Sequence, residues 1–337
     1  MKTFFTKSRL EVNVPENLDE DNSQRFNVTE IEKAKEYYNK NGYVIFNNLI
    51  KEKYCDTIRS HWDTYVKNYK GKIYRQTSGK TEKNNFNENN WIMNPILNIQ
   101  SLNSKHFKIF KEYIENNVFN NISLSSILNG FFNKKPKIIQ SMYFEGNCVT
   151  NEHQDTYFLD SNKVGTLTAA WIALEEIKAD AGRFFVISGS HQIDIKKNKF
   201  YNNILSNHNR YIQEIISISN SMDLEIKAPY LNKGDVLFWN SKTIHGSLDS
   251  QSKTNSRSSI TIHAIPENHE HLQWHKNLIK TPSDDLGNVL IYRKKDQNIL
   301  KNRFIFFIES YFPGFFYWFK NNYIRIVHKQ TYHKQSN

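Results

Sequence analysis

Short runs of β-branched and aromatic residues, separated by turn-forming residues, dominate the sequence from Pro136 onward. In order, these runs are KIIQSMYFEG, GTLTAAWIALEEI, RFFVISGS, GDVLFWNS and SSITIHAI. Runs of this length between Gly, Asn, Asp and Ser are typical of the strands of a sandwich or a barrel. They predict an all-β core over about residues 136–266, interrupted after Ile193 by a polar and partly helical insertion.

The residues that precede this core have helical patterns. VTEIEKAKEYYNKNGYVIFNNLI predicts a helix with Thr29 as its N-cap and Gly42 just after its last turn, followed by a strand over 43–46. Apolar residues recur every four positions in KEKYCDTIRSHWDTYVKNY, and HFKIFKEYIENNVFNNISLSSILNGFF is also helical in pattern. Residues 1–25 are polar and are expected to be disordered, and residues 71–90 to form a long loop. The fold class is therefore α+β, with a helical N-terminal layer on a β-core.

Composition and charge exclude several classes of protein. The two cysteines, Cys55 and Cys148, form neither a disulfide framework nor a zinc-ligand spacing, which favours a cytoplasmic protein. We find no secretory signal and no run of about 20 apolar residues that could span a bilayer. The formal net charge is +11, but from Arg293 onward nine basic residues accompany only two acidic ones. Because the excess charge lies at one end and no nucleic-acid-binding motif accompanies it, we expect no nucleic acid partner.

A candidate metal site begins in the segment NEHQDTYFLD, where His153 and Asp155 stand two positions apart. Residues i and i+2 of a strand face the same way, so both side chains can point into the β-core. His245, which follows the predicted strand GDVLFWNS, can supply a third ligand. Two histidines and one carboxylate leave open positions on a metal, as in non-haem iron(II) oxygenases. Zinc accepts similar ligands, so these three residues alone do not define the metal.

Arg257 adds the feature that narrows this choice. It lies 12 residues after His245 and opens a predicted strand, so its side chain can return to the interior of the core. A guanidinium there can bind a carboxylate through two parallel hydrogen bonds. In an iron site with open positions, that carboxylate would be the far end of 2-oxoglutarate, and Ser247 could donate a further hydrogen bond to it.

At these residues the chain resembles the phytanoyl-CoA dioxygenase family of iron(II)- and 2-oxoglutarate-dependent oxygenases. The resemblance lies in HQDTYFLDSNKVGTLTAAWIALEEIKADAGRFFVISGSH, in KGDVLFWNSKTIHGS and in Arg257, within about residues 140–263. It implies a double-stranded β-helix, also called a jelly roll and similar to the cupins. It also implies iron bound by His153, Asp155 and His245. The implied contacts to 2-oxoglutarate are Arg257, Ser247, Trp171 and Gln140.

The resemblance also bears on the reaction and on the pocket. Family halogenases lack the carboxylate ligand, so the presence of Asp155 favours hydroxylation. Tyr157 and Phe158 follow the metal motif directly, and His263 shares the strand face of Arg257, so these three residues are candidates for lining the substrate pocket. Packing in the core is the alternative for each of them. Lys72 and Lys80 are the candidates for a family lysine that contacts 2-oxoglutarate.

The C-terminal segment NRFIFFIESYFPGFFYWFKNNYIRIVHK is strongly aromatic and is flanked by basic residues. A segment this apolar must be covered. Short helices that pack on the β-core, with a homodimer contact through 304–327, are one reading. A peripheral membrane contact through the same residues is the other, in which aromatic side chains enter the headgroup region. We expect a dioxygenase domain over 26–290 and a basic, aromatic, helical extension over 291–337.

The sequence therefore predicts an enzyme that uses iron(II), 2-oxoglutarate and O2. It would hydroxylate an unactivated C–H bond of a small metabolite or of a lipid-like or acyl substrate, with release of succinate and CO2. A non-catalytic β-barrel binding protein is one alternative. The other is a cupin-like isomerase or hydrolase that uses zinc or manganese, although that reading leaves Arg257 unexplained. The identity of the substrate is not encoded in any motif that we recognise.

Overall fold

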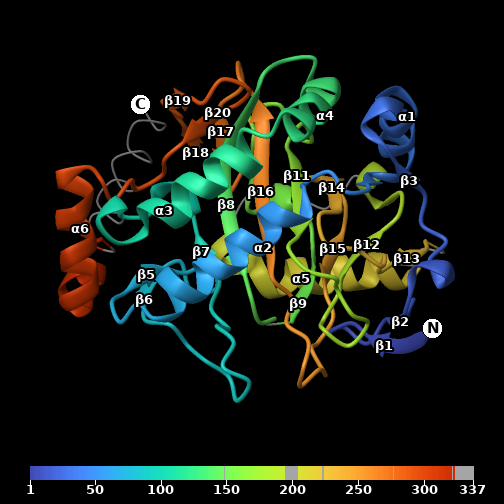
Figure 1. Ribbon diagram of the computed structural model, residues 1–337, viewed down its shortest axis with the longest axis horizontal. Helices are drawn as coiled ribbons and strands as arrows, with labels where there is room; N and C mark the ends of the chain where they lie inside the picture. Colours follow the sequence, from blue (N-terminus) through green and yellow to red (C-terminus); the bar gives the residue numbers. More distant parts are fainter. Residues whose placement is uncertain (148, 194–203, 222–223, 276, 321, 323–337) are drawn as a thin grey trace, which may run out of the picture.

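The computed structural model describes residues 1–337 except 148, 194–203, 222–223, 276, 321 and 323–337. Its core consists of two β-sheets (Figure 1). In spatial order, the larger sheet contains β19 (Ser283–Asp285), β20 (Leu290–Tyr292), β8 (Pro136–Phe144), β16 (Ser259–Pro266), β11 (Thr168–Ala173), β14 (Val236–Asn240), β4 (Tyr43–Phe46) and β3 (Arg25–Phe26), with β7 (Ile96–Leu97) beside β8. The smaller sheet contains β13 (Ile226–Lys227), β12 (Phe184–Ile187), β15 (His245–Ser247) and β9 (Thr150–His153).

Successive strands of the core alternate between the two sheets. β8, β11, β14 and β16 belong to the larger sheet, whereas β9, β12 and β15 belong to the smaller one. Within each sheet these strands pair in antiparallel fashion. Alternation of this kind is how a jelly roll closes its edges, so the jelly-roll core expected from the sequence is confirmed.

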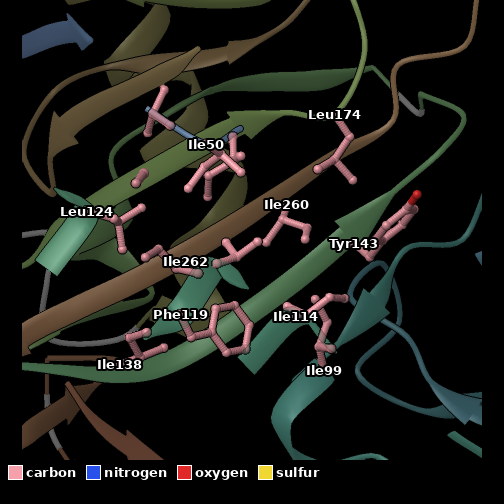
Figure 2. Packing of buried hydrophobic residues seen from close by; sticks show 14 of the residues in the cluster. Ile50, Ile99, Ile114, Phe119, Leu124, Ile138, Tyr143, Leu174, Ile260 and Ile262 are labelled. Atoms are coloured by element: carbon pink, nitrogen blue, oxygen red, sulfur yellow. The ribbon is translucent and has the colours of Figure 1, made fainter. Parts of the chain in front are cut away.

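Both faces of the central strands of the larger sheet are buried, which explains why apolar residues are frequent in them. One face packs against the smaller sheet, where Trp171 and Trp239 meet Phe184. The other face carries side chains such as Ile138, Ile260 and Ile262 and is covered by helices (Figure 2). β11 and β16 contain no exposed residue, although β16 still alternates, with Ser259, Thr261 and His263 on one face and Ile260 and Ile262 on the other.

Four helices lie on the N-terminal side of the β-core in sequence: α1 (Ile31–Asn41), α2 (Glu52–His61), α3 (Ser104–Ile114) and α4 (Ile122–Phe132). Gly42 ends α1 with φ at 78°, as its position after the helix predicts. Thr29 is not the N-cap, because the helical turn already begins at Val28 and the carboxylate of Glu30 accepts the backbone N–H of Asn27 at 3.0 Å. α2 and α3 continue as π-helical turns over Trp62–Lys67 and Glu115–Phe119.

The expectation that residues 1–25 are disordered is wrong. β1 (Lys2–Phe5) and β2 (Glu11–Val14) form an antiparallel hairpin. Its buried residues Phe4, Val12 and Val14 pack against a cluster that includes Phe185 of the smaller sheet. The hairpin contains few apolar residues, so its sequence gives only a weak strand pattern. It is ordered because those residues pack against the surface that the hairpin covers.

The expected long loop over residues 71–90 contains a small hairpin of β5 (Ile73–Tyr74) and β6 (Thr81–Glu82). Three further strands form a separate sheet: β10 (Leu159–Ser161), β17 (His271–Gln273) and β18 (Asn277–Ile279). The insertion contains α5 (Ile204–Ser221), and the C-terminal extension contains α6 (Leu300–Tyr311). Cys148 and the part of 304–327 formed by residues 321 and 323–327 lie outside the described residues. None of the helices in the described part of the chain is long and apolar enough to cross a membrane.

Candidate metal centre

His153, Asp155 and His245 come together on the smaller sheet. His153 ends β9 and His245 begins β15, and the two strands pair with these residues directly opposite each other. Their ring centroids are 4.3 Å apart. Gln154 keeps an extended backbone before the short 3-10 helix Asp155–Tyr157, so Asp155 turns to the same side as His153.

The atoms that can bind a metal converge. One ligand atom from each of the three residues lies within 4.8 Å of the others. Oδ1 of Asp155 is 3.9 Å from Nε2 of His153 and 3.5 Å from Nε2 of His245. A metal that bonds each ligand atom at about 2.0–2.2 Å can bridge such separations.

Backbone carbonyls determine which nitrogen of each imidazole faces this centre. Nδ1 of His153 lies 2.8 Å from the carbonyl oxygen of Asn151, and Nδ1 of His245 lies 2.9 Å from that of Thr243. A carbonyl oxygen only accepts hydrogen bonds, so each Nδ1 must carry the proton and donate it. With Nδ1 as the donor, Nε2 is the nitrogen of each ring that is available to a metal, and it points toward Asp155. This arrangement, with one nitrogen held by an outer acceptor, is the usual one for metal-binding histidines.

The second oxygen of Asp155 is held from the opposite side. Trp239 donates its Nε1–H to Oδ2 at 2.8 Å. Nε2 of His263 lies 3.3 Å from the same oxygen, although without the alignment of a hydrogen bond. Oδ2 thus contacts two residues of the larger sheet, whereas Oδ1 is directed at the two histidines.

The protonation states of the site suit a metal. Burial lowers the pKa of the His153 imidazole to about 4, so the ring is neutral at physiological pH. For Asp155, burial raises the pKa, but the neighbouring imidazoles of His245 and His263 outweigh it and hold the pKa of this carboxyl well below its usual range. Neutral imidazole and ionised carboxylate are the forms that bind a metal ion.

Arg257 is a buried cation two residues before β16. Its Nη1 donates to the carbonyl oxygen of Gly182 at 3.1 Å. The guanidinium carbon lies 5.4 Å from the ring centroid of Phe144 and 5.8 Å from that of Trp171. The guanidinium is therefore enclosed by aromatic rings, an environment in which a charge-assisted pair with an anion is strong.

Phe184 connects this cation to the metal ligands. The ring of Phe184 stacks on Trp171 at 5.8 Å and lies 5.4 Å from the ring of His245. Arg257 and the ligands therefore belong to one interior, which is what a dicarboxylate would need to reach the metal at one end and the guanidinium at the other. The residues present thus fit 2-oxoglutarate.

Ser247 and Gln140 are also placed around this interior. Ser247 is buried in β15, and its hydroxyl accepts the backbone N–H of Thr150 at 3.0 Å and lies 3.2 Å from Oδ1 of Asn147. Gln140 is half-buried in β8 and stands opposite His263 in the paired strand β16. Both residues remain predictions as contacts of 2-oxoglutarate.

The residues after the metal motif contact the insertion. Tyr157 is buried and stacks on Tyr211 of α5, with ring centroids 3.5 Å apart. The hydroxyl of Tyr211 accepts the backbone N–H of Gln154 at 2.9 Å. Phe158 is half-buried, with its ring edge-on to His153 at 5.6 Å. Of the two, Phe158 is the side chain that lies beside a metal ligand, whereas Tyr157 packs under α5.

The two candidate lysines are engaged elsewhere. Lys72 donates to the backbone carbonyl of Ser310, and the ammonium of Lys80 lies 4.8 Å from the ring centroid of Tyr317. Both contacts are with the C-terminal extension. Neither lysine is therefore brought to the metal centre in this structure.

Sequence reasoning missed Trp239 as part of this site. The residue lies in the strong apolar run GDVLFWNS and is indistinguishable there from a core residue. A signal was nevertheless available in the alternation of side chains along each strand. Trp239 and His263 lie on the same face of the larger sheet as Trp171 and Arg257, the face that is directed at the ligands. His263 was expected only as a pocket-lining or core residue, and it lies against the ligand carboxylate.

A jelly-roll core with this histidine, carboxylate and arginine set defines the class of non-haem iron, 2-oxoglutarate-dependent oxygenases. Residues 38–259 match the sequence model of the phytanoyl-CoA dioxygenase family, and the chain belongs to that family. All three candidate metal ligands and Arg257 lie inside the matched segment. The family expected from the sequence is confirmed.

Curated relatives match part of the chain. Phytanoyl-CoA dioxygenase 1 of Oryza sativa subsp. japonica is 28% identical over 158 residues, which cover 46% of this chain and 53% of the relative. A phytanoyl-CoA dioxygenase domain-containing protein 1 homolog of Caenorhabditis elegans is 24% identical over 180 residues, with 52% and 56% covered. The chain thus spans about half the length of the curated relatives that it matches.

Solved structures share the fold. The non-haem α-ketoglutarate-dependent carbocyclase SnoK from nogalamycin biosynthesis is 14% identical, with a TM-score of 0.52 over 71% of this chain and 85% of that one. The corresponding epimerase SnoN is also 14% identical, with a TM-score of 0.53 over 79% and 99%. The family and the donor set of the site agree with iron(II) and 2-oxoglutarate as cofactors.

Proposed function

We propose that this protein is an iron(II)- and 2-oxoglutarate-dependent dioxygenase that hydroxylates an unactivated C–H bond of a small-molecule substrate. The observation that carries the proposal is the convergence of Nε2 of His153, Nε2 of His245 and Oδ1 of Asp155, each with its other polar atom held by the protein. Balanced chemically, one C–H bond, O2 and 2-oxoglutarate give one C–OH bond, succinate and CO2.

The protein's part in this reaction is to bind and orient. Iron(II) with bound 2-oxoglutarate activates O2 and supplies the oxidising power. Arg257 binds the far carboxylate of 2-oxoglutarate, with Ser247 and Gln140 as further polar contacts and Trp171 as an aromatic wall. Trp239 donates to Oδ2 of Asp155 and His263 lies beside that oxygen, so Oδ1 would be the oxygen that holds iron(II) together with the two histidines.

The substrate would lie beside Phe158 and His263, under the cover that α5 provides through Tyr211. A mostly aromatic wall favours a lipid-like or acyl substrate, or an apolar small metabolite. Hydroxylation is favoured because Asp155 retains its carboxylate. Enzymes of the same fold are named as a carbocyclase and an epimerase, so product analysis must distinguish these outcomes.

The test is a visible absorption spectrum recorded without oxygen as iron(II) and then 2-oxoglutarate are added. We expect a weak charge-transfer band that is absent in Asp155→Ala and weakened in Arg257→Ala, together with slow succinate formation once O2 is admitted. The exposed carboxylate of Asp249, close to His245 in the sequence, provides a matched control in Asp249→Ala.

Two other results would replace this function. Iron that binds without the band and without succinate would indicate a non-catalytic β-barrel binding protein. Preferential binding of zinc or manganese, with turnover that does not require 2-oxoglutarate, would indicate a cupin-like isomerase or hydrolase.

A further inference from the structure

The C-terminal extension presents apolar side chains to solvent. In α6, Leu300, Phe304, Phe307 and Tyr311 are exposed, and Phe304 has 64% of its surface accessible. Their spacing of four, three and four residues places them in one stripe along the helix. α6 lies at the opposite end of the molecule from the N-terminal hairpin (Figure 1).

The stripe continues beyond the end of α6. Residues 313–320 are again helical, and Phe312, Phe315, Trp318 and Phe319 are exposed. The ring of Phe307 lies 4.9 Å from that of Tyr311 and 6.2 Å from that of Phe312, so the aromatic side chains remain in contact across the break. We call this surface the aromatic face; it consists of Leu300, Phe304, Phe307, Tyr311, Phe312, Phe315, Trp318 and Phe319.

Glu309 and Ser310, two polar residues of α6, are buried on its inner side. Glu309 is only 3% exposed and accepts hydrogen bonds from the hydroxyls of Tyr74 at 2.9 Å and Tyr317 at 2.7 Å. Ser310 is equally buried, and its hydroxyl donates to Thr81 at 3.0 Å. A helix on the surface of a soluble domain normally turns its apolar stripe inward. In α6 an apolar stripe faces outward while Glu309 and Ser310 are buried, so the outer face is suited to be covered by something other than water.

The charges around the aromatic face indicate what covers it. Lys301 and Arg303 are exposed on the two sides of the stripe at its start, and Lys320 is exposed near its end. The acidic residue in this stretch, Glu309, is buried on the opposite side. Aromatic side chains flanked by exposed cations match the headgroup region of a bilayer that contains anionic lipid.

A second copy of the chain fits this surface less well. A two-fold interface would place the aromatic face against itself, and Lys301, Arg303 and Lys320 would then meet the same cations of the other copy. An anionic surface instead pairs every one of these charges. With 12 residues, α6 is about 18 Å long, shorter than the roughly 30 Å of a bilayer core, so it would lie along the surface.

We propose that the aromatic face is a docking surface for anionic lipid, on which the enzyme rests with residues 300–320 in the headgroup region. This proposal does not depend on the reaction at the metal centre. It gives the basic, aromatic extension a role. The family match ends at residue 259 and does not include the extension.

Flotation of the full-length protein with vesicles tests the proposal. One set of vesicles contains equal parts of phosphatidylcholine and phosphatidylserine, and the other contains phosphatidylcholine alone. We expect binding to the anionic vesicles, about tenfold weaker for each of Phe304→Ser and Trp318→Ser. We expect binding about fivefold weaker for each charge removed in Lys301→Gln and Arg303→Gln. These positions are exposed, so the variants should keep the thermal stability of the parent protein.

The control is Ile122→Ser in α4, which removes a similarly exposed apolar side chain, 69% accessible, from another part of the surface. It should bind vesicles like the parent protein. A parent protein that ignores both kinds of vesicle and sediments as a dimer, dissociated by Phe304→Ser, would overturn the proposal in favour of a second copy. A monomer that ignores vesicles would overturn it in favour of cover by the remaining C-terminal residues.

Discussion

The metal centre and the C-terminal extension place polar and apolar groups in opposite ways. At the metal centre, polar atoms of His153, Asp155 and His245 are directed inward and are enclosed by aromatic rings. In α6, the carboxylate of Glu309 is buried toward the protein, while the aromatic face is directed outward. Each arrangement would be costly if nothing else were bound.

The difference shows how polar atoms directed inward, or apolar side chains directed outward, indicate the kind of partner that a region binds. Inward ligand atoms with fixed tautomers suit a bound cation, and the buried guanidinium of Arg257 suits a carboxylate. An outward aromatic face with flanking cations requires an apolar, anionic cover. The two regions should therefore respond to different partners, and substitutions in one should leave the other unchanged.

The largest effect is expected for Asp155→Ala. Loss of one of three protein ligands should lower iron(II) affinity by more than the roughly 100-fold that marks the upper range for outer-shell changes, and turnover should fall to background. Equilibrium dialysis with iron(II) and succinate formation measure the two effects. Vesicle binding should be unchanged in the same variant, because the two regions bind different partners. An iron affinity equal to that of Asp249→Ala would show that Asp155 is not a metal ligand.

The next effect is expected for Arg257→Lys. A lysine keeps the charge but not the two parallel hydrogen bonds, so the KM for 2-oxoglutarate should rise about tenfold to 100-fold with little change in iron affinity. Arg293→Lys is the control, because Arg293 is a partly buried arginine that pairs with Glu115 and Asp284 outside the site. If both variants raised the KM equally, the role of Arg257 in binding 2-oxoglutarate would be lost.

A smaller effect is expected for Trp239→Phe, which removes the donor to Oδ2 of Asp155 while keeping an aromatic ring. Iron(II) affinity should fall about tenfold, because the carboxylate is then free to rotate. Trp62→Phe serves as the control, since Nε1 of Trp62 is buried without a hydrogen-bond partner in the described part of the chain. Comparable iron affinity in the two variants would show that the orientation of Asp155 does not depend on Trp239.

The smallest effect is expected for Glu309→Gln on the inner side of α6. The two tyrosine hydroxyls lose a charged acceptor, and the free energy of unfolding should fall by about 1–2 kcal/mol, or a few degrees in Tm. Thermal denaturation followed by circular dichroism measures this change, with Glu112→Gln on the exposed side of α3 as the control. Iron affinity should be the same in both variants, and a change in it would mean that the extension and the metal centre are coupled.

Much of the metal centre could be predicted from the sequence because its ligands are local signals. His153 and Asp155 are two positions apart, and His245 and Arg257 lie beside strong strand patterns. The jelly-roll core could be predicted for the same reason, since most of its strands are short runs of β-branched and aromatic residues between turn-forming residues.

The partners of these residues could not be predicted, because strand register brings them together. Trp239 and His263 reach Asp155 from β14 and β16, which are distant from it in sequence. The N-terminal hairpin was missed for a related reason: Phe4 and Val12 are isolated apolar residues, and the surface that orders them belongs to the smaller sheet. The burial of Glu309 in α6 depends on where Tyr74 lies, and no local sequence pattern predicts that position.

Anomalous diffraction at the iron edge, from crystals loaded with iron(II) and 2-oxoglutarate without oxygen, tests the central claim most directly. We predict one strong peak enclosed by Nε2 of His153, Nε2 of His245 and Oδ1 of Asp155, with Oδ2 still bonded to Trp239 and the far carboxylate of 2-oxoglutarate on Arg257. Iron bound through an Nδ1 atom, or at another place in the molecule, would contradict the account.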